Sequence, residues 1–452
     1  MSISELLSDL RSRFAGELLL PEDERYDLAR LPWNRAIDQR PVAVAIPAHV
    51  DDLRLLLATA RASGVTLAVQ PSGHGASASL DDAIVIRMDA FDDLDADLDA
   101  GTVRIGAGVR WGHVVEALEG TGWAAPSGSS PVVTAAGYTL GGGHSWFSRT
   151  AGLGSDNLRT ATVLRTDGTH ERVDDESDPE LMWALRGAGG LVAIVTEVEV
   201  DLIRTPDVRG ATLTFEAEAS GAVIRAVRDL AADAPDTLNV FVTSSRMPDA
   251  PQLPDAIRGK SFLTVQALST AGEAAALLGA LRAVPGLIAE SSGPSSPGAL
   301  IAQSTEPTEP SPSRGASAAL AALDDELIDA LVGFHGRPEN RPVIGIEIRM
   351  LGGALRSPRR SGLADLAEAR WLVYALAPLF PGAPVEPGDA SLAEFQAIVR
   401  DAAAVKTIPT FLSPGKTLDL AATGEQIAHL TALRARFDPE ALLHEGRLPR
   451  QG

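Results

Sequence analysis

The sequence predicts an α+β protein with two or three domains. Its 452 residues are about three times the usual ~150 residues of one domain, and 45% of them are hydrophobic, so each domain can bury a core. Residues 41–206 alternate short β-type runs with glycine-rich turns, whereas the residues after about 205 alternate strands with alanine-rich stretches. The second pattern is typical of a sheet with helices packed on one face.

The first half is predicted to open as a βαβ-like unit. Short β-branched runs predict strands at residues 41–47, 65–69, 83–88, 102–108, 160–168 and 192–203. Leucines at helical spacing between Asp51 and Gly64 predict a helix over residues 51–63. In residues 195–202 acidic and apolar side chains alternate, so we expect a half-exposed strand with one wet face.

The second half is predicted to alternate strands and helices. Strand candidates lie at residues 212–215, 238–244, 261–268 and 343–350. Alanine-rich stretches predict helices at residues 217–232, 271–284, 317–334 and 363–379. Residues 290–317 are rich in Ser, Pro, Gly and Thr, which predicts a long mobile loop or lid. The tail returns to a helical pattern over residues 424–443, which stops at Asp438-Pro439.

Charge and cysteine content exclude several functions. The chain has 39 basic and 60 acidic residues and a net charge of -21, and such a surface repels nucleic acid and anionic lipid. It has no cysteine, which excludes disulfides, cysteine-bound metal centres and a cysteine nucleophile. Redox chemistry would therefore need a bound cofactor. Its first residues do not resemble a signal peptide and no apolar run could span a bilayer, so we expect a cytoplasmic protein.

Two glycine-containing motifs are the strongest functional signals. Residues 71–77 follow a strand, and their small side chains would let backbone N–H groups cradle a pyrophosphate; a plain turn with a surface His74 is an equal alternative. Residues 126–157 contain Gly137 and the triple glycine 141–143, interleaved with apolar residues that favour burial. We therefore interpret the second motif as a ligand-binding segment, in which the ligand approaches the backbone closely, rather than as a surface loop.

Other segments resemble known binding motifs but lack a required residue at one position. The glycine runs at 106–108 and 187–190 lack the last glycine of the dinucleotide fingerprint, and residues 415–417 lack the first glycine of a phosphate loop. The acidic run 95–99 is followed by Ala100 where a calcium loop requires glycine. The histidines show no pair at metal-ligand spacing. Neither a nucleotide-triphosphate enzyme nor a metalloenzyme is predicted.

In their order along the chain, the two glycine motifs resemble the vanillyl-alcohol oxidase superfamily of flavoproteins, and within it the bacterial berberine-bridge-enzyme-like, hydroxynicotine-oxidase-like group. The runs Trp33-Asn34, 178–187 and 195–197 match the family as well, and the likeness is dense over about 30–206. It implies a PCMH-type FAD-binding domain of two α/β subdomains, followed by a substrate domain with an antiparallel sheet covered by helices. The implied domains are 1–206 (core 36–206) for FAD, 207–414 for substrate, and 415–452 as a segment that returns to the FAD-binding domain.

The resemblance implies FAD as the cofactor. In the family a strand ends in Arg-x-Gly-Gly-His and the histidine ring is bonded to the C8 methyl group of FAD, so His74 is the implied attachment site. Gln70 and Ser72 replace the arginine and a glycine of that motif, which leaves open whether the bond forms. Ser130 stands where many family members attach FAD a second time through cysteine, so at most one link can form. The implied FAD-binding residues are Gln70, Ser72, Gly73, His74, Gly75, Ala76, Ser77, Ser130, Val133, Gly137, Gly141, Gly142, Gly143, Leu153, Asp156 and Ile194.

The usual catalytic base of the family is missing, because its Tyr-x-Asn-Phe segment corresponds here to residues 408–411. Glu347 shares a strand face with Arg349 by period two, and its strand resembles a family segment that supplies an active-site glutamate. Beside a flavin its pKa could rise toward neutrality, and Arg349 would hold an anionic or carbonyl group. An exposed ion pair on a sheet face is an alternative of equal weight. Tyr138 and His144 would lie near the flavin ring, where packing or a substrate wall is the favoured role of each.

The sequence therefore predicts an FAD-dependent oxidase. A small-molecule alcohol or amine would pass hydride to flavin N5, Glu347 or His144 would take the proton, and O2 would reoxidise the flavin to give hydrogen peroxide. Two alternatives stay open: a flavin-dependent oxygenase that modifies secondary metabolites, and a flavin-binding protein that has lost catalysis. The predicted partners are a small-molecule substrate and O2, without nucleic acid or membrane, and the sequence gives no oligomeric state.

Overall fold

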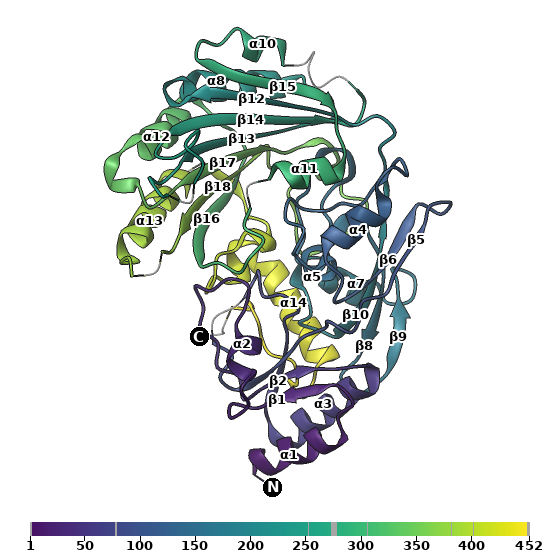
Figure 1. Cartoon of the computed structure of the whole chain (residues 1–452). Coiled ribbons are helices and arrows are strands. Elements are labelled where there is room, and N and C mark those ends of the chain that lie inside the picture. The colour runs from purple at the N-terminus through teal and green to yellow at the C-terminus, as the bar shows by residue number, and fades with distance from the viewer. Residues whose placement is uncertain are drawn as a thin grey trace.

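The computed structural model describes residues 2–76, 79–251, 253–272, 278–304, 306–380, 382–400 and 402–449. They form an α+β protein, as the sequence predicts, with two lobes that are stacked in Figure 1. The N-terminal lobe contains strands β1 to β11, and the C-terminal lobe contains strands β12 to β19.

The first sheet of the N-terminal lobe has the strand order β1-β2-β4-β3. These strands span Glu17–Leu19 (β1), Ala43–Ile46 (β2), Thr66–Val69 (β3) and Ala83–Ile86 (β4). The helix α3 (Val50–Ser63) joins β2 to β3, and both strands run parallel to β4, which confirms the βαβ-like opening. Gly64 ends α3 with a φ of 74°, a left-handed conformation that favours glycine. The helices α1 (Ile3–Arg13) and α2 (Tyr26–Arg30) complete this part.

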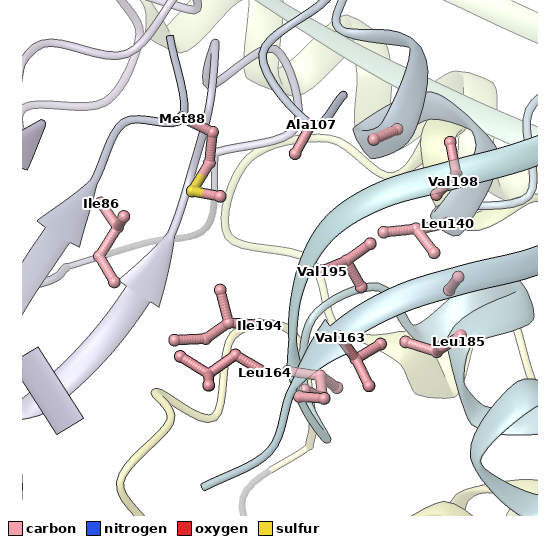
Figure 2. Close-up of a cluster of buried hydrophobic side chains, with 14 of the residues drawn as sticks. Ile86, Met88, Ala107, Leu140, Val163, Leu164, Leu185, Ile194, Val195 and Val198 are labelled. Carbon is pink, nitrogen blue, oxygen red and sulfur yellow. The ribbon is translucent and has the colours of Figure 1, made fainter. Parts of the chain in front are cut away.

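The second sheet of the N-terminal lobe is antiparallel, with the order β5-β6-β10-β8-β9. These strands span Leu94–Asp97 (β5), Thr102–Gly106 (β6), Leu158–Leu164 (β8), His170–Val173 (β9) and Ile194–Asp201 (β10). The main core of the lobe joins the two sheets, with Ile86 and Met88 on one side and Leu164 and Ile194 on the other (Figure 2). The remaining elements are α4 (Trp111–Leu118), β7 (Trp123–Ala124), α5 (Ala135–Leu140), α6 (Ser148–Ala151), α7 (Pro179–Ala188) and β11 (Ile203–Arg204).

The expectation of one wet face on β10 is confirmed only in part, because Glu197 and Asp201 are partly exposed but Glu199 is buried. Glu199 is only 8% exposed, and Arg172 of β9 donates a hydrogen bond of 2.6 Å to its carboxylate. Arg159 of β8 lies 3.7 Å from the same carboxylate. Because β10 is the central strand, arginines from its neighbours can cover the acidic side chains and neutralise them there.

The C-terminal lobe is built on one eight-stranded sheet with the order β15-β12-β14-β13-β17-β18-β16-β19. All the pairs in this sheet are antiparallel. The strands span Arg209–Glu216 (β12), Leu238–Arg246 (β13), Ser261–Ser269 (β14), Leu287–Pro294 (β15), Ser313–Leu320 (β16), Gly345–Met350 (β17), Trp371–Pro378 (β18) and Ala403–Val405 (β19). The helices α8 (Ser220–Ala232), α12 (Asp325–Gly336) and α13 (Glu386–Arg400) share a core with one face of the sheet, as predicted (Figure 1).

Three predictions for this lobe are wrong. Residues 317–334 were expected to be one helix, but they begin as strand β16 before α12, and residues 363–379 contain strand β18. The expected loop at 290–317 instead contains β15, the helix α11 (Pro297–Gln303) and the start of β16. Alanine-rich runs have high helix propensity, but strand pairing within a large sheet overrides this weak preference. In the predicted helix 271–284 the structure shows α10 (Gly279–Arg282), while residues 273–277 lie outside the described part.

The tail of the chain returns to the N-terminal lobe. The helix α14 (Gly424–Phe437) ends before Asp438, as predicted, and packs against α7. Beyond it, backbone hydrogen bonds of 2.8 Å join Leu442 and His444 to Leu67 of β3. The domain boundaries after residues 206 and 414 stay predictions. In the described part of the chain, no helix is both long enough and apolar enough to cross a membrane, and the cytoplasmic location stays a prediction.

Candidate functional site

His74 lies in the turn that follows β3, on the side of the N-terminal lobe that meets the chain's tail. Its ring stacks on Trp33 with ring centroids 4.4 Å apart, and Ser72 Oγ lies 2.9 Å from His74 Nδ1. The other ring nitrogen, Nε2, is buried and has no hydrogen-bond partner among the described residues. Burial, and then the nearby positive charge of Arg110, lowers the pKa of His74 to about 3. The imidazole is therefore neutral at physiological pH.

The backbone of this turn is held by other parts of the chain. Gly73 has a φ of +74°, and a Cβ atom there would lie 2.6 Å from the side chain of Pro32. Arg447 from the tail donates hydrogen bonds to the carbonyl groups of Gly75 and Ala76. Ser77, which the resemblance also implied as a FAD-binding residue, lies outside the described residues. The turn is thus a fixed structure rather than a free surface loop.

The entrance to this turn is built by the first strands. The side-chain amides of Gln70 and Gln39 exchange hydrogen bonds of 2.8 and 3.2 Å. A cavity of about 570 Å³ lies beside the turn. Its lining includes Trp33, Ser72 and the arginines Arg35, Arg87 and Arg110. Arginines concentrated in an acidic protein favour an anionic group in this region.

The glycines of the second motif lie close to other side chains of the protein, which leave no room for a Cβ atom. A Cβ atom at Gly143 would lie 2.3 Å from the Tyr138 ring, and one at Gly128 would lie 2.9 Å from it. On the other side, Cβ atoms at Gly141 and Gly142 would lie 2.9 Å from Thr410 and 3.0 Å from Ile408. The sequence interpretation that a ligand demands close backbone approach at the triple glycine 141–143 is therefore incomplete, because the chain's own side chains already require glycine there.

The predicted catalytic residues on β17 do face one another. Arg349 Nε donates a hydrogen bond to Glu347, and Arg349 is only 9% exposed. The apolar residues between and beside them, Ile346, Ile348 and Met350, point into the core beneath the helices. Glu347 and Arg349 therefore occupy the opposite face of the sheet, as period two predicts, and the alternative of an exposed surface pair is wrong.

The N-terminal lobe contributes His144 to the same cluster. His144 is 2% exposed, and its Nδ1 atom lies 3.3 Å from a guanidinium nitrogen of Arg349. Burial, followed by the charge of Arg349, lowers the pKa of His144 well below 6.5. Burial also raises the pKa of the Tyr138 hydroxyl above its usual value of 10.0. Both side chains are therefore neutral at physiological pH.

Several residues of this cluster were missed by the sequence analysis. Tyr374 of β18 is the register partner of Glu347, and it lay in a run that was interpreted as a helix. The guanidinium of Arg349 lies 4.5 Å from the ring centre of Phe241 and 5.0 Å from that of Phe411. If residues 371–378 are assigned as a strand, its side chains alternate between two faces. This alternation would identify Tyr374 as a residue of the polar face.

Glu306 is a further residue without a sequence signal. It follows α11 in the segment between β15 and β16, and its carboxylate accepts a hydrogen bond from Ser129 Oγ. Ser304 of the same segment donates a hydrogen bond of 3.1 Å to the Ser129 carbonyl. The Glu306 side chain is exposed. Its segment is thus joined to Ser129 by two hydrogen bonds.

The remaining predicted FAD-binding residues are distributed more widely. Ser130 is 6% exposed, next to Ser129, and Val133 is partly buried against the main core. Gly137 is an exposed position of α5. Three others make contacts within the protein: Leu153 packs in a cluster with residues of the C-terminal lobe, Asp156 accepts a 2.8 Å hydrogen bond from the Leu153 N–H, and Ile194 is buried in the main core.

Buried polar atoms test whether this region could hold a polar cofactor. Among the described residues, six such atoms without a hydrogen-bond partner belong to the two glycine motifs: His74 Nε2, Tyr138 Oη, Thr139 Oγ1, His144 Nε2, Trp146 Nε1 and Asn157 Oδ1. Buried polar groups are nearly always satisfied by protein, water or ligand, so these atoms fit a bound polar group such as a flavin. In the described ranges no three His, Asp or Glu side chains come together as metal ligands could.

Comparison with known proteins agrees with this geometry. A family model described as an FAD binding domain matches residues 41–174. The (R)-6-hydroxynicotine oxidase of Paenarthrobacter nicotinovorans is 33% identical over 193 residues, which are 42% of this chain and 42% of that protein. The glucooligosaccharide oxidase of Sarocladium strictum is 29% identical over 218 residues, 46% of this chain and 44% of that protein. The aligned segments thus span less than half the length of these curated relatives.

A solved structure extends the likeness in fold to the whole chain. The wild-type BBE-like protein 1 of Physcomitrella patens covers 100% of both chains, with a TM-score of 0.81 and 16% sequence identity. The family match falls on the strands that carry the His74 turn, and the fold match includes both lobes. Residues 41–174 therefore match an FAD binding domain, and the whole chain shares its fold with a BBE-like protein.

Proposed function

We propose that the protein is an FAD-dependent oxidase that takes hydride from a small-molecule alcohol or amine, with O2 as the final electron acceptor and hydrogen peroxide as the second product. The observation that carries this proposal is the buried cluster of Glu347, Arg349 and His144, which joins the large sheet to the glycine-rich motif. Relatives that are oxidases of nicotine derivatives and of oligosaccharides support both substrate classes.

The residues of the two glycine motifs would hold the cofactor. Bound FAD would supply the hydride acceptor at N5. His74 is the proposed attachment site, because its Nε2 atom has no partner in the described part of the protein and the ring is neutral. Ser130 offers no thiol, so a cysteinyl link at that place is excluded. We propose a single histidyl link.

Glu347 is the proposed proton acceptor. Its carboxylate lies on the inner face of the sheet, and Arg349 holds it in place through a hydrogen bond. His144 contacts the far side of the same guanidinium, so its role is to position Arg349. A neutral imidazole with a lowered pKa is a weak base, which makes Glu347 the better acceptor.

Anaerobic mixing of the FAD-loaded protein with a panel of alcohols, amines and sugars tests the proposal. Loss of the flavin absorption with one substrate, followed by peroxide release when oxygen is admitted, is the expected result. A product that contains an oxygen atom from O2 would instead identify an oxygenase. If no substrate bleaches the flavin, and flavin reduced by dithionite is stable in air, the oxidase proposal is wrong.

A further inference from the structure

The cavity of about 570 Å³ beside the His74 turn is a space of its own. It is bordered by Ser72 of the turn, by residues from α2 and the loop after it, and by residues 308–310 of the C-terminal lobe. Trp33 also lines it, and one face of the Trp33 ring is already covered by His74. Within the described residues, neither His74 nor any member of the second glycine motif lines the cavity. The cavity therefore lies beside the region assigned to the flavin, not within it.

Three arginines of the cavity wall have no carboxylate partner among the described residues. Arg87 is 7% exposed, and its guanidinium donates hydrogen bonds to main-chain carbonyl groups, including that of Gln70. Arg35 is partly exposed, and its Nη1 atom is buried without a hydrogen-bond partner in the described part of the chain. Arg110 is exposed. An anion in the cavity would give these cations a partner.

The other charges of the cavity wall do not compensate these arginines. A fourth arginine, Arg25, is neutralised by Glu17 at 2.6 Å. The acidic residues of the wall are Asp89 and Glu309, which are both exposed. In the described ranges neither of them forms an ion pair with an arginine of the wall. In a chain with 60 acidic and 39 basic residues, three unpaired cations around one cavity indicate a site for an anion.

We propose that the cavity binds an organic carboxylate, which pairs with Arg35 and Arg110 and rests its apolar part against Trp33. Both arginines would donate charge-assisted hydrogen bonds to the carboxylate, and the buried charge of Arg87 would add to the attraction. Because residues 31–33 supply an apolar wall, an organic anion would remove more apolar surface from water than inorganic phosphate. This site goes beyond the proposed oxidase function and does not depend on it.

Titration calorimetry of the FAD-loaded protein with benzoate tests the proposal. Benzamide has nearly the same shape without the charge, so it is the matched ligand. Benzoate should bind at least ~10-fold more tightly than benzamide, because its carboxylate adds charge-assisted hydrogen bonds. The benzoate affinity should fall as salt screens the arginines. Inorganic phosphate should bind more weakly than benzoate, because it has no apolar part to bury.

Variants assign the binding to this cavity. Arg110→Gln and Arg35→Gln should each lower the benzoate affinity by about 10-fold and leave the benzamide affinity unchanged. Arg359→Gln removes an exposed arginine that does not line the cavity, so this control should keep the wild-type affinity. Because Arg110 is exposed, its replacement should leave the fold intact, and the FAD content of each variant checks this.

Four results would overturn the proposal. Benzoate and benzamide could bind equally well, phosphate could bind more tightly than benzoate, or Arg110→Gln could bind benzoate as the wild type does. Benzoate binding only in protein that lacks FAD would assign the arginines to the cofactor site instead. The measurement is binding without turnover, so its result is separate from that of the oxidase assay.

Discussion

Arg349 and His144 come from different lobes, yet the guanidinium of one lies 3.3 Å from Nδ1 of the other. The arginine comes from β17 of the large sheet, and the histidine directly follows the triple glycine. Both side chains are more than nine-tenths buried, so this contact is a fixed part of the fold. Through Arg349, it joins the carboxylate of Glu347 to the glycine-rich motif.

Replacing Glu347 tests its role as proton acceptor. Glu347→Gln keeps the shape of the side chain and removes the base, so the rate of flavin reduction by substrate should fall by roughly 10²- to 10⁴-fold. The FAD content and the unfolding temperature should stay close to those of the wild type. Glu339→Gln, at an exposed ion pair, is the control and should reduce flavin at the wild-type rate. Full activity of the Glu347→Gln variant would show that another residue accepts the proton.

The attachment of FAD can be tested at His74 and Ser72. In the wild type the yellow colour should stay with the polypeptide after acid precipitation, and His74→Ala should lose it. Ser72 Oγ lies 2.9 Å from His74 Nδ1 and orients the ring, so Ser72→Ala should attach FAD more slowly while still binding it. The mass of the intact protein measures the attached fraction over time.

Serine 79 supplies the control for that experiment, because its hydroxyl accepts a hydrogen bond from the Asp81 N–H and does not touch His74. Ser79→Ala should attach FAD at the wild-type rate. The pKa of His74 is lowered to about 3, so the ring stays neutral and the attachment rate should not change between pH 5 and 8. The covalent proposal is wrong if wild-type FAD washes out as easily as FAD from His74→Ala.

The sequence predicted the N-terminal lobe better than the C-terminal lobe, for a physical reason. Strands such as β3 and β4 are β-branched runs bounded by turn residues, so local preference and sheet pairing agree. In β16 and β18 alanine and leucine favour a helix locally, and only their pairing within the large sheet makes them strands. The sequence could not reveal this pairing because the partners lie far apart along the chain.

The candidate site shows the same division. The Glu347–Arg349 pair could be predicted, because period two on one strand is a local pattern. The contact between Glu306 and Ser129 could not be predicted, because it joins residues 177 positions apart and depends on the path of a connecting segment in the folded protein. The glycines at 141–143 were correctly identified as sites of close approach, but the approaching groups were the protein's own Tyr138, Ile408 and Thr410.

A steric prediction follows from Gly143. Gly143→Ala should be much more destabilising than Gly64→Ala, although the two glycines have similar φ values of +67° and +74°. Each alanine has a left-handed backbone cost of about 1–2 kcal/mol. Only at Gly143 would the new Cβ also lie 2.3 Å from the Tyr138 ring, which should add roughly 1–3 kcal/mol. Urea unfolding of the two variants measures the difference, and equal losses would show that the Tyr138 ring can move aside freely.

The raised pKa of the Asp156 carboxyl group predicts how the free energy of unfolding depends on pH. The carboxyl is 4% exposed, and burial raises its pKa from 3.8 to about 7. The folded protein therefore binds a proton more tightly than the unfolded chain, so the contribution of Asp156 is fully present below pH 3.8 and is lost as the pH rises through about 7. Asp156→Asn mimics the protonated form and keeps an oxygen for the Leu153 N–H. The variant should match the wild type near pH 4 and exceed its free energy of unfolding above pH 7, by roughly 4 kcal/mol at most. Unfolding curves across this range measure the difference, and a constant difference between the two proteins would mean that the carboxyl stays ionised in the fold.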